Sequence, residues 1–232
     1  MTRRAEIAAG LAVVDDRVRR ACLAAGRHPA EVTIIVVTKT FGASDIRLLA
    51  ELGVRDIGEN RDQEAAAKAA ECSDLPLTWH FVGQLQTNKA RSVARYASVV
   101  HSVDRPRLVD ALARAADANG QPVGCLVQVS LQAHPTPGRG GAAETEVPAL
   151  ADAIAAADQL RLLGVMAVAP LEVDPAAAFD RLAQIATVLR ERHPGAHWIS
   201  AGMSEDLEPA IAAGATHLRV GSAILGRRPV AG

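Results

Sequence analysis

The chain has few aromatic residues, few cysteines and no excess of charge of either sign. Aromatic side chains make up 3% of its 232 residues, and the abundant alanine suits helices packed on a sheet better than an aromatic-rich sandwich. Cys22, Cys72 and Cys125 are far apart without a CxxC spacing, which argues against a zinc site or a disulfide framework. With a formal net charge of −1, no general field favours nucleic acid or an anionic membrane as a partner.

Long hydrophobic runs are also missing. No apolar run approaches the length needed to span a bilayer, and Met1 to Arg4 is followed by a charged amphipathic segment instead of the apolar core of a signal peptide. With the widely spaced cysteines, this predicts a soluble cytoplasmic protein. The length fits one large α/β domain, and we expect a single barrel domain over residues 1–232.

Lysine is scarce, with three Lys against 22 Arg. One of them, Lys39, closes the apolar run from Val32 to Thr38. Arginine stays protonated at physiological pH, whereas a desolvated lysine can lose its proton and attack a carbonyl group. Lys39 is therefore the first candidate for covalent chemistry. Lys68, within a run of alanines, is predicted to be an ordinary exposed helix residue, and Lys89 to lie on a solvated helix face.

Short β-branched runs alternate with longer alanine-rich helical stretches. After an opening helix over about residues 4–25, the pattern predicts eight strands near residues 32–38, 54–58, 79–82, 97–101, 123–129, 161–167, 197–201 and 217–220. This alternation predicts an α/β fold, a single TIM-type (β/α)8 barrel with an extra N-terminal helix. The alternative is a doubly wound open sheet, but no GxGxxG follows the first strand. Helix N-caps are predicted at Ser44, Asp104, Asp174 and Ser204.

In such a barrel the C-terminal ends of the strands converge on one site. Small residues follow strands seven and eight, in Ser200 to Ser204 and Arg219 to Ser222. Before a helix start, such residues let backbone N–H groups point at a phosphate, helped by the helix dipole and by serine hydroxyls. A reactive Lys39 on strand one and a phosphate seat on strands seven and eight suggest a phosphorylated aldehyde bound as a Schiff base.

The only long stretch without periodicity runs from Ser130 to Gly141. Its two prolines and three glycines exclude a helix or a central strand. We predict a mobile loop after strand five, on the ligand-binding face of the barrel, where Arg139 could reach an anion.

Seven motifs, in order and over nearly the whole chain, resemble those of the YggS/PROSC family of pyridoxal phosphate homeostasis proteins. They are Val37-Thr38-Lys39-Thr40, Gly58-Glu59-Asn60 with Gln63-Glu64, and the segments 79–89, 101–105, 164–167, 202–206 and 219–226. The resemblance implies a barrel related to the amino-terminal domain of alanine racemase, with pyridoxal 5′-phosphate (PLP) held as a Schiff base on Lys39. It also implies a role in intracellular vitamin B6 and amino-acid homeostasis, with no established turnover.

The resemblance further implies the roles of individual residues. Arg219 is expected to face the pyridine nitrogen, where a permanent cation donates a hydrogen bond, disfavours protonation of the ring and so restrains carbanion chemistry. Asn60 is expected near the ring or its hydroxyl, and His80 to face inward as a buried, hydrogen-bonded residue. Some family members are thought to hold PLP at a second lysine, here Lys89. The residues expected near the phosphate are Ser200, Gly202, Met203, Ser204, Gly221 and Ser222.

Three functions compete at this stage: a PLP-binding homeostasis protein, a racemase-like fold-type III PLP enzyme, and a cofactor-free lysine Schiff-base aldolase. A racemase needs a second base, and the sole tyrosine, Tyr96, precedes strand four on the wrong side of the barrel. An aldolase would surround its lysine with carboxylates, and only Glu59 is an evident strand-end candidate. Because both enzymes lack an expected group, we predict a non-enzymatic monomer that binds PLP and supplies PLP-dependent apo-enzymes.

This chain departs from the family pattern at Arg61, where many family members carry Tyr.

Overall fold

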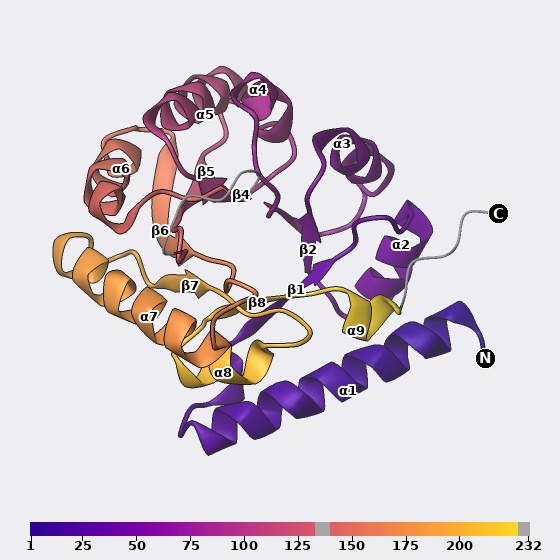
Figure 1. Cartoon of the computed structure of the whole chain (residues 1–232). Helices are drawn as coiled ribbons and strands as arrows, with labels where there is room; N and C mark the ends of the chain where they lie inside the picture. Colours follow the sequence, from indigo (N-terminus) through magenta and orange to yellow (C-terminus); the bar gives the residue numbers. More distant parts are fainter. Residues whose placement is uncertain (133–139, 227–232) are drawn as a thin grey trace.

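Eight parallel strands form a closed barrel in the order β1 to β8 in the computed structural model, which describes residues 1–132 and 140–226 (Figure 1). The TIM-type fold predicted from the sequence is confirmed, and no strand boundary differs from its prediction by more than two residues. The strands are β1 (Thr33–Val37), β2 (Asp56–Glu59), β3 (Thr78–Phe81), β4 (Val99–Val103), β5 (Val123–Gln128), β6 (Leu160–Met166), β7 (Trp198–Ser200) and β8 (His217–Val220).

Helices surround the barrel, and the predicted extra N-terminal helix is confirmed as α1 (Arg3–Ala24). It lies across α8 and α9, outside the ring (Figure 1). A Cβ at Gly10 would come within 2.4 Å of the Ile224 carbonyl oxygen, so glycine allows this close contact with α9. The other helices are α2 (Ala43–Glu51), α3 (Asp62–Glu71), α4 (Ala90–Val93), α5 (Pro106–Asn119), α6 (Val147–Ala155), α7 (Pro175–Arg192), α8 (Leu207–Ala212) and α9 (Ser222–Leu225); three-residue turns are η1 (Pro29–Glu31), η2 (Thr87–Lys89) and η3 (Glu144–Glu146).

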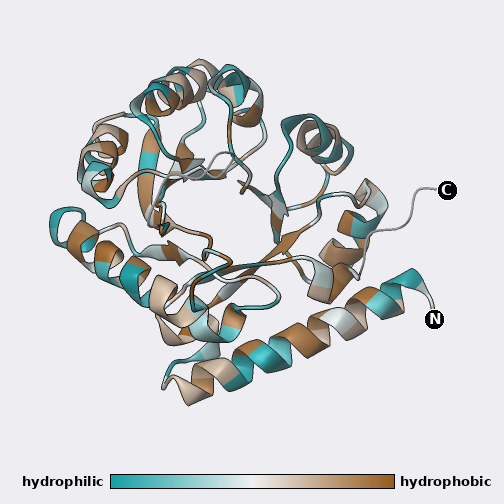
Figure 2. Ribbon diagram, viewed as in Figure 1, coloured by the Kyte–Doolittle hydropathy of each residue, from teal (hydrophilic) through white to brown (hydrophobic). Residues whose placement is uncertain are grey.

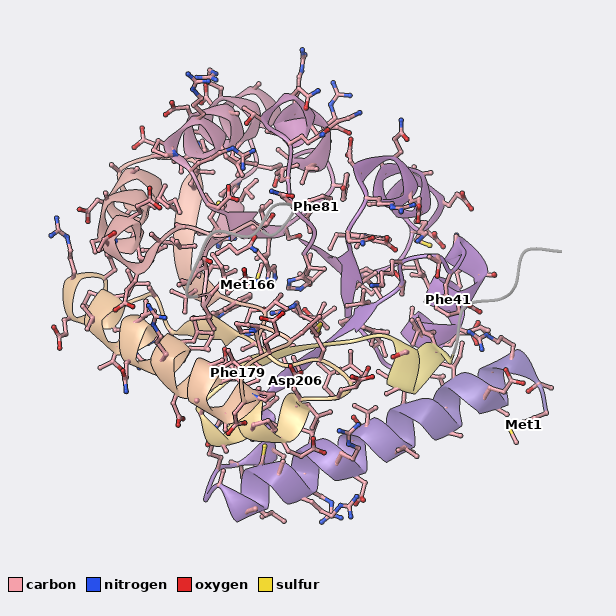
Figure 3. All side chains as sticks on the ribbon, in the orientation of Figure 1. Met1, Phe41, Phe81, Met166, Phe179 and Asp206 are labelled. Carbon is pink, nitrogen blue, oxygen red and sulfur yellow. The ribbon has the colours of Figure 1, made fainter. Side chains whose placement is uncertain are left out.

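Hydrophobic residues form two separate layers because successive strand side chains point to opposite faces. The outer layer fills the space between strands and helices, and the hydrophobic sides of helices such as α5 and α7 face the strands (Figure 2). The inner layer is small and contains Val99, Leu126 and Met166 with the partly buried Leu163 and Trp198. Polar side chains therefore occupy part of the barrel interior (Figure 3).

At the start of the loop after β5, Ser130 N–H donates to Ala142 O at 2.9 Å. Residues 133–139, including Arg139, lie outside the described residues. The mobile loop therefore stays a prediction. Among the helices that the structure describes, none is long and apolar enough to cross a bilayer.

Candidate functional site

Lys39 follows the C-terminal end of β1, where the chain turns sharply. Thr38 N–H still pairs with Gly58 O of β2 at 3.0 Å, and Lys39 after it is exposed. Thr40 then adopts a φ of 72°, a left-handed conformation that costs a β-branched residue roughly 1–2 kcal/mol. Such strained backbone persists only where the surroundings hold it, and it is frequent at ligand sites. The side chain of Thr38 points out of the barrel toward Glu59, and Lys39 follows it at the rim of the barrel mouth.

A buried ion pair lies directly behind Lys39, and it corrects the prediction that Lys68 is exposed. Lys68 Nζ donates to Thr38 O at 2.9 Å and to Glu59 Oε1 at 2.6 Å, and Thr38 Oγ1 donates to the same carboxylate oxygen at 2.6 Å. The Lys68 side chain is 10% exposed and that of Glu59 is fully buried. Burial raises the pKa of the Glu59 carboxyl, against the opposing effect of its hydrogen bonds from Lys68 and Thr38.

The signal for this ion pair was present in the sequence. Ala65, Lys68, Ala69 and Cys72 are buried, and they follow the i, i+3, i+4, i+7 spacing of one helix face. The small residues mark the face of α3 that packs on the barrel. Lys68 shares that face, so its amine had to find a buried partner.

The ends of β7 and β8 bring most of the expected phosphate-binding residues together. Ser204 Oγ accepts from Ser222 Oγ at 3.2 Å and from Ala223 N–H at 3.4 Å. A Cβ at Gly221 would meet the Val37 carbonyl oxygen at 2.9 Å. The turn after β8 is thus in close contact with the end of β1, two residues before Lys39.

The turn after β7 depends on a glycine and a carboxylate. Gly202 has a φ of +89°, and a Cβ there would come within 2.6 Å of Ala210 Cβ, so a larger residue does not fit. Met203 N–H donates to Asp206 Oδ1 at 2.6 Å. That amide is therefore already engaged, as is the hydroxyl proton of Ser222, and among the described residues the Ser204 hydroxyl keeps a proton to offer an anion.

Arg219 and Ser200 lie deeper, inside the barrel. Arg219 is 5% exposed, and it donates from Nη1 to Ser200 Oγ at 2.7 Å and from Nη2 to Ala167 O at 2.8 Å. Burial lowers the pKa of Arg219 to about 10, while Asp206 acts in the opposite direction; the guanidinium therefore stays charged at neutral pH. The Ser200 hydroxyl is held between Arg219 and His101, whose Nδ1 is 2.9 Å away.

Asn60 follows the end of β2, the strand next to β1. Its Oδ1 is buried and lacks a hydrogen-bond partner among the described residues, which leaves an acceptor available to a ligand. A Cβ at Gly83 would come within 2.3 Å of Asn60 O, so the turn after β3 packs tightly against it. Arg61, at the position where many family members carry Tyr, is exposed and pairs with Glu64 at 3.3 Å.

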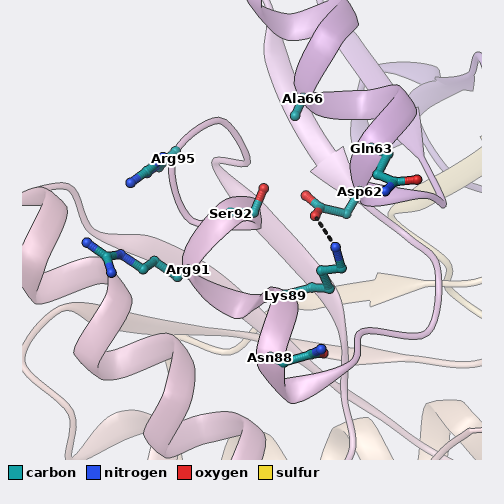
Figure 4. A pocket seen from close by; sticks show the side chains of 8 residues that line it. All are labelled: Asp62, Gln63, Ala66, Asn88, Lys89, Arg91, Ser92 and Arg95. Carbon is teal, nitrogen blue, oxygen red and sulfur yellow. Dashed lines mark ion pairs between the residues drawn. The ribbon is translucent and has the colours of Figure 1, made fainter.

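Lys89 lines two open cavities. One is shared with Asn60 and Phe81, at the ends of β2 and β3, and the other, of 580 Å³, lies between α3 and α4 (Figure 4). Its Nζ lies 3.9 Å from Asp62 Oδ2 and its side chain is 40% exposed, in agreement with the predicted solvated position. Arg91 and Arg95 also line this cavity. Its lining contains none of the residues at the ends of β1, β7 and β8.

Tyr96 lies outside the barrel, three residues before β4 begins. Its ring packs edge-on against Trp79, with the ring centroids 6.5 Å apart. Burial raises the pKa of the Tyr96 hydroxyl. A phenol in this position has neither the location nor the acidity of a base at the mouth of the barrel.

Comparison with known proteins agrees with this geometry. The family model of the alanine racemase N-terminal domain matches residues 14–229, which defines the class of barrel. The chain is 42% identical over 246 residues to the pyridoxal phosphate homeostasis protein of Mycobacterium tuberculosis, with 97% of this chain and 94% of the relative covered. It is 40% identical over 222 residues to the protein of the same name from Pseudomonas aeruginosa, with 96% of each covered. The chain belongs to the family of pyridoxal phosphate homeostasis proteins.

A solved structure supports the same relationship. PipY of Synechococcus elongatus, whose structure has PLP bound, superposes with a TM-score of 0.82 at 34% sequence identity. The match covers 95% of this chain and 100% of PipY. The family predicted from the seven motifs is therefore confirmed.

Proposed function

We propose that this chain binds PLP at the C-terminal mouth of the barrel, with Lys39 as the covalent attachment point, and serves in PLP homeostasis by holding and releasing the cofactor. The observation that carries the proposal is the proximity of the ends of β1 and β8. Val36 pairs with Val220 across these strands, so Lys39 and Ser222 follow adjoining strand ends. The buried cation of Arg219 lies on β8, three residues before Ser222.

The residues at the mouth fit a phosphorylated pyridine aldehyde. The turn after β8 can approach β1 because residue 221 is glycine, which brings the hydroxyls of Ser204 and Ser222 toward Lys39. The unpartnered Oδ1 of Asn60 is an acceptor on the other side of β1. Gly202 and Met203 shape the turn after β7, and Ser200 supports Arg219. PLP would supply an electrophilic aldehyde carbon to this site.

Lys39 would hold the cofactor reversibly. Its Nζ would be the amine that binds the aldehyde of PLP, with one water molecule lost on binding and taken up again on release. Arg219 would donate a hydrogen bond to the pyridine nitrogen. Because a guanidinium is a cation, it would disfavour protonation of that nitrogen, so the ring would be a weaker electron sink.

The surroundings of Lys39 favour a binding protein over the two enzymes. An aldolase needs a carboxylate directed at the reacting carbon, and Glu59 is directed out of the barrel toward Lys68 and Thr38. A racemase needs a second base opposite the lysine, and Tyr96 is packed outside the barrel against Trp79. We therefore propose a non-catalytic role, as a single-domain monomer over residues 1–232, with PLP-dependent apo-enzymes as recipients of the cofactor.

The test uses the fact that the chain has only three lysines. Purified protein is incubated with PLP, reduced with borohydride and digested, and the modified peptide is identified by mass spectrometry. We expect a yellow protein modified at Lys39, and a Lys39→Ala variant that stays colourless. Lys89→Ala is the matched control, because Lys89 is also accessible but lies in η2, away from the ends of β1, β7 and β8, and the variant should bind PLP like the wild type.

Transfer is measured next, by adding PLP-loaded protein to an apo-enzyme and following the recovery of enzyme activity. We expect the apo-enzyme to recover its activity when PLP-loaded wild-type protein is added. Light scattering should give the mass of one chain. A wild-type protein that remains colourless with PLP, or that is modified equally at Lys89, would refute the assignment to Lys39.

A further inference from the structure

A continuous series of hydrogen bonds crosses the barrel interior from Arg219 to the opposite end of the barrel. Arg219 Nη1 donates to Ser200 Oγ at 2.7 Å, and His101 Nδ1 lies 2.9 Å from the same oxygen. His101 Nε2 lies 3.0 Å from His80 Nδ1, and His80 Nε2 lies 2.9 Å from Asp56 Oδ1. We call this series the interior relay. Asp56 begins β2, at the N-terminal end of the barrel, and 28% of its side chain is exposed.

The guanidinium at one end fixes the direction of every hydrogen bond in the relay. Arginine has donors only, so Ser200 Oγ accepts from Arg219 and its own proton is left for His101 Nδ1. Burial lowers the pKa of His101 well below its usual value, with His80 and Arg219 adding to the effect, so His101 is neutral. A neutral His101 that accepts at Nδ1 carries its proton on Nε2 and donates it to His80 Nδ1.

The last bond follows by the same reasoning. His80 accepts at Nδ1, so in its neutral form it carries its proton on Nε2 and donates to the Asp56 carboxylate. Each of the four bonds then runs from the cation of Arg219 toward the anion of Asp56, and both nitrogens of each histidine ring have a partner. The reverse direction would make Ser200 Oγ accept from both Arg219 and His101, with its own proton unused.

We propose that Ser200, His101, His80 and Asp56 are positioning residues that hold Arg219 in the orientation in which it binds the ligand at the mouth of the barrel. This inference rests on the proposed PLP site and extends it to residues that do not touch the ligand. The relay fixes Nη1, the Ala167 carbonyl fixes Nη2, and the guanidinium cannot rotate between them. The relay delivers no proton to the ligand, because its only end at the mouth is an arginine.

The direction of the relay is tested without any ligand. In apo protein labelled with ¹⁵N-histidine, His80 and His101 are assigned through His80→Gln and His101→Gln variants. We expect both rings as the Nε2–H tautomer at pH 7.5. An Nδ1–H tautomer at either position overturns the proposed direction, whatever the protein does with PLP.

The positioning role is tested by the rate at which bound PLP leaves, measured by transfer to an apo-enzyme. We expect His101→Gln and Asp56→Asn to release PLP at least tenfold faster than the wild type. His217→Gln is the matched control, because His217 also faces the interior, where it stacks on Trp198 with ring centroids 3.7 Å apart, but it is outside the relay. Its release rate should stay within twofold of the wild type.

The outcomes separate this inference from the proposed function. A wild-type chain that never binds PLP would refute the proposed function, while the histidine tautomers would still decide the relay. Equal acceleration in His101→Gln and His217→Gln would mean that any change inside the barrel loosens the site, and the positioning role would be wrong. Asp56→Asn keeps the shape of the side chain, so it provides a result if His101→Gln does not fold.

Discussion

Thr38 connects the exposed Lys39 to the buried Lys68, since Lys39 follows it in the chain and Lys68 binds its carbonyl oxygen. The same residue type thus occurs in two different surroundings, one exposed and one buried. The position of Lys39 at the end of a strand could be predicted from the sequence. The burial of Lys68 is indicated by its spacing from Ala65 and Cys72 on one face of α3, but its partner could not be predicted, because Glu59 is on a separate strand.

Replacing Lys68 by methionine tests the strength of the buried pair. Lys68→Met leaves the Glu59 carboxylate buried without its cation, and we expect a loss of about 3–5 kcal/mol in the free energy of unfolding. In the double variant Lys68→Met/Glu59→Gln the buried charge is gone, so most of that loss should be regained. Urea denaturation of the wild type, Lys68→Met, Glu59→Gln and the double variant measures the cycle. A single variant as stable as the wild type would show that the pair contributes nothing.

At the scale of elements, the strands were easier to predict than the helix starts. Asp174 caps α7 as predicted, accepting from Ala176 N–H at 3.0 Å. The other three caps were wrong: α2 starts one residue before Ser44, Arg105 precedes α5 in place of Asp104, and α8 begins only after Asp206. The hydroxyl of Ser204 instead accepts from Ala223 N–H, in the segment after β8. That contact depends on tertiary structure, which local capping patterns do not contain.

An arginine of α1 binds the turn after β7 that carries Ser204. Arg17 Nη1 donates to Ser204 O at 2.9 Å, and its other nitrogens pair with both oxygens of Glu208 at 2.8 Å. The ion pair is partly exposed and is worth only about 0.5–1 kcal/mol, and the charged hydrogen bond to the carbonyl about 1.5 kcal/mol more.

We therefore expect Arg17→Gln to raise the dissociation constant for PLP by about threefold to tenfold, because the turn that carries Ser204 is held less firmly. Fluorescence or absorbance titration with PLP measures the change. Arg19→Gln is the matched control, since Arg19 is on the same helix but pairs only with the nearby Asp16 among the described residues. Equal affinity in Arg17→Gln and Arg19→Gln would show that α1 does not support the site.

Considered as a whole, the barrel could be predicted from strand period, and its mouth from the residues at the strand ends. The interior relay could not be predicted as a unit. The alternation of a strand indicates that His80 faces inward, as the structure confirms, but its partners come from β2 and β4. Arg219 and Ser200 join only because β8 closes against β1 and β7. Contacts across the interior depend on how the barrel closes and how its strands are staggered. The residue pattern of a single strand contains no information on either.

The polar interior makes the stability of the whole molecule depend on pH. Burial, and to a lesser extent His80, lowers the pKa of His217 to about 4, while Asp56 acts weakly in the opposite direction. The unfolded chain binds a proton at His217 near pH 6.5 and the folded chain does not, so protons favour unfolding. The stabilisation is complete above pH 6.5 and is lost as the pH falls toward 4, by about 3 kcal/mol for this one residue.

His217→Gln removes this titration. The difference in unfolding free energy between wild type and variant, from urea denaturation at each pH, should be constant above pH 7. It should fall by about 3 kcal/mol between pH 6.5 and 4, because the wild type alone loses the contribution of a neutral His217. Carboxylates titrate in both proteins and cancel in the difference. A difference that stays flat down to pH 4 would mean that folding leaves the pKa of His217 unchanged, and that water reaches the polar half of the barrel interior.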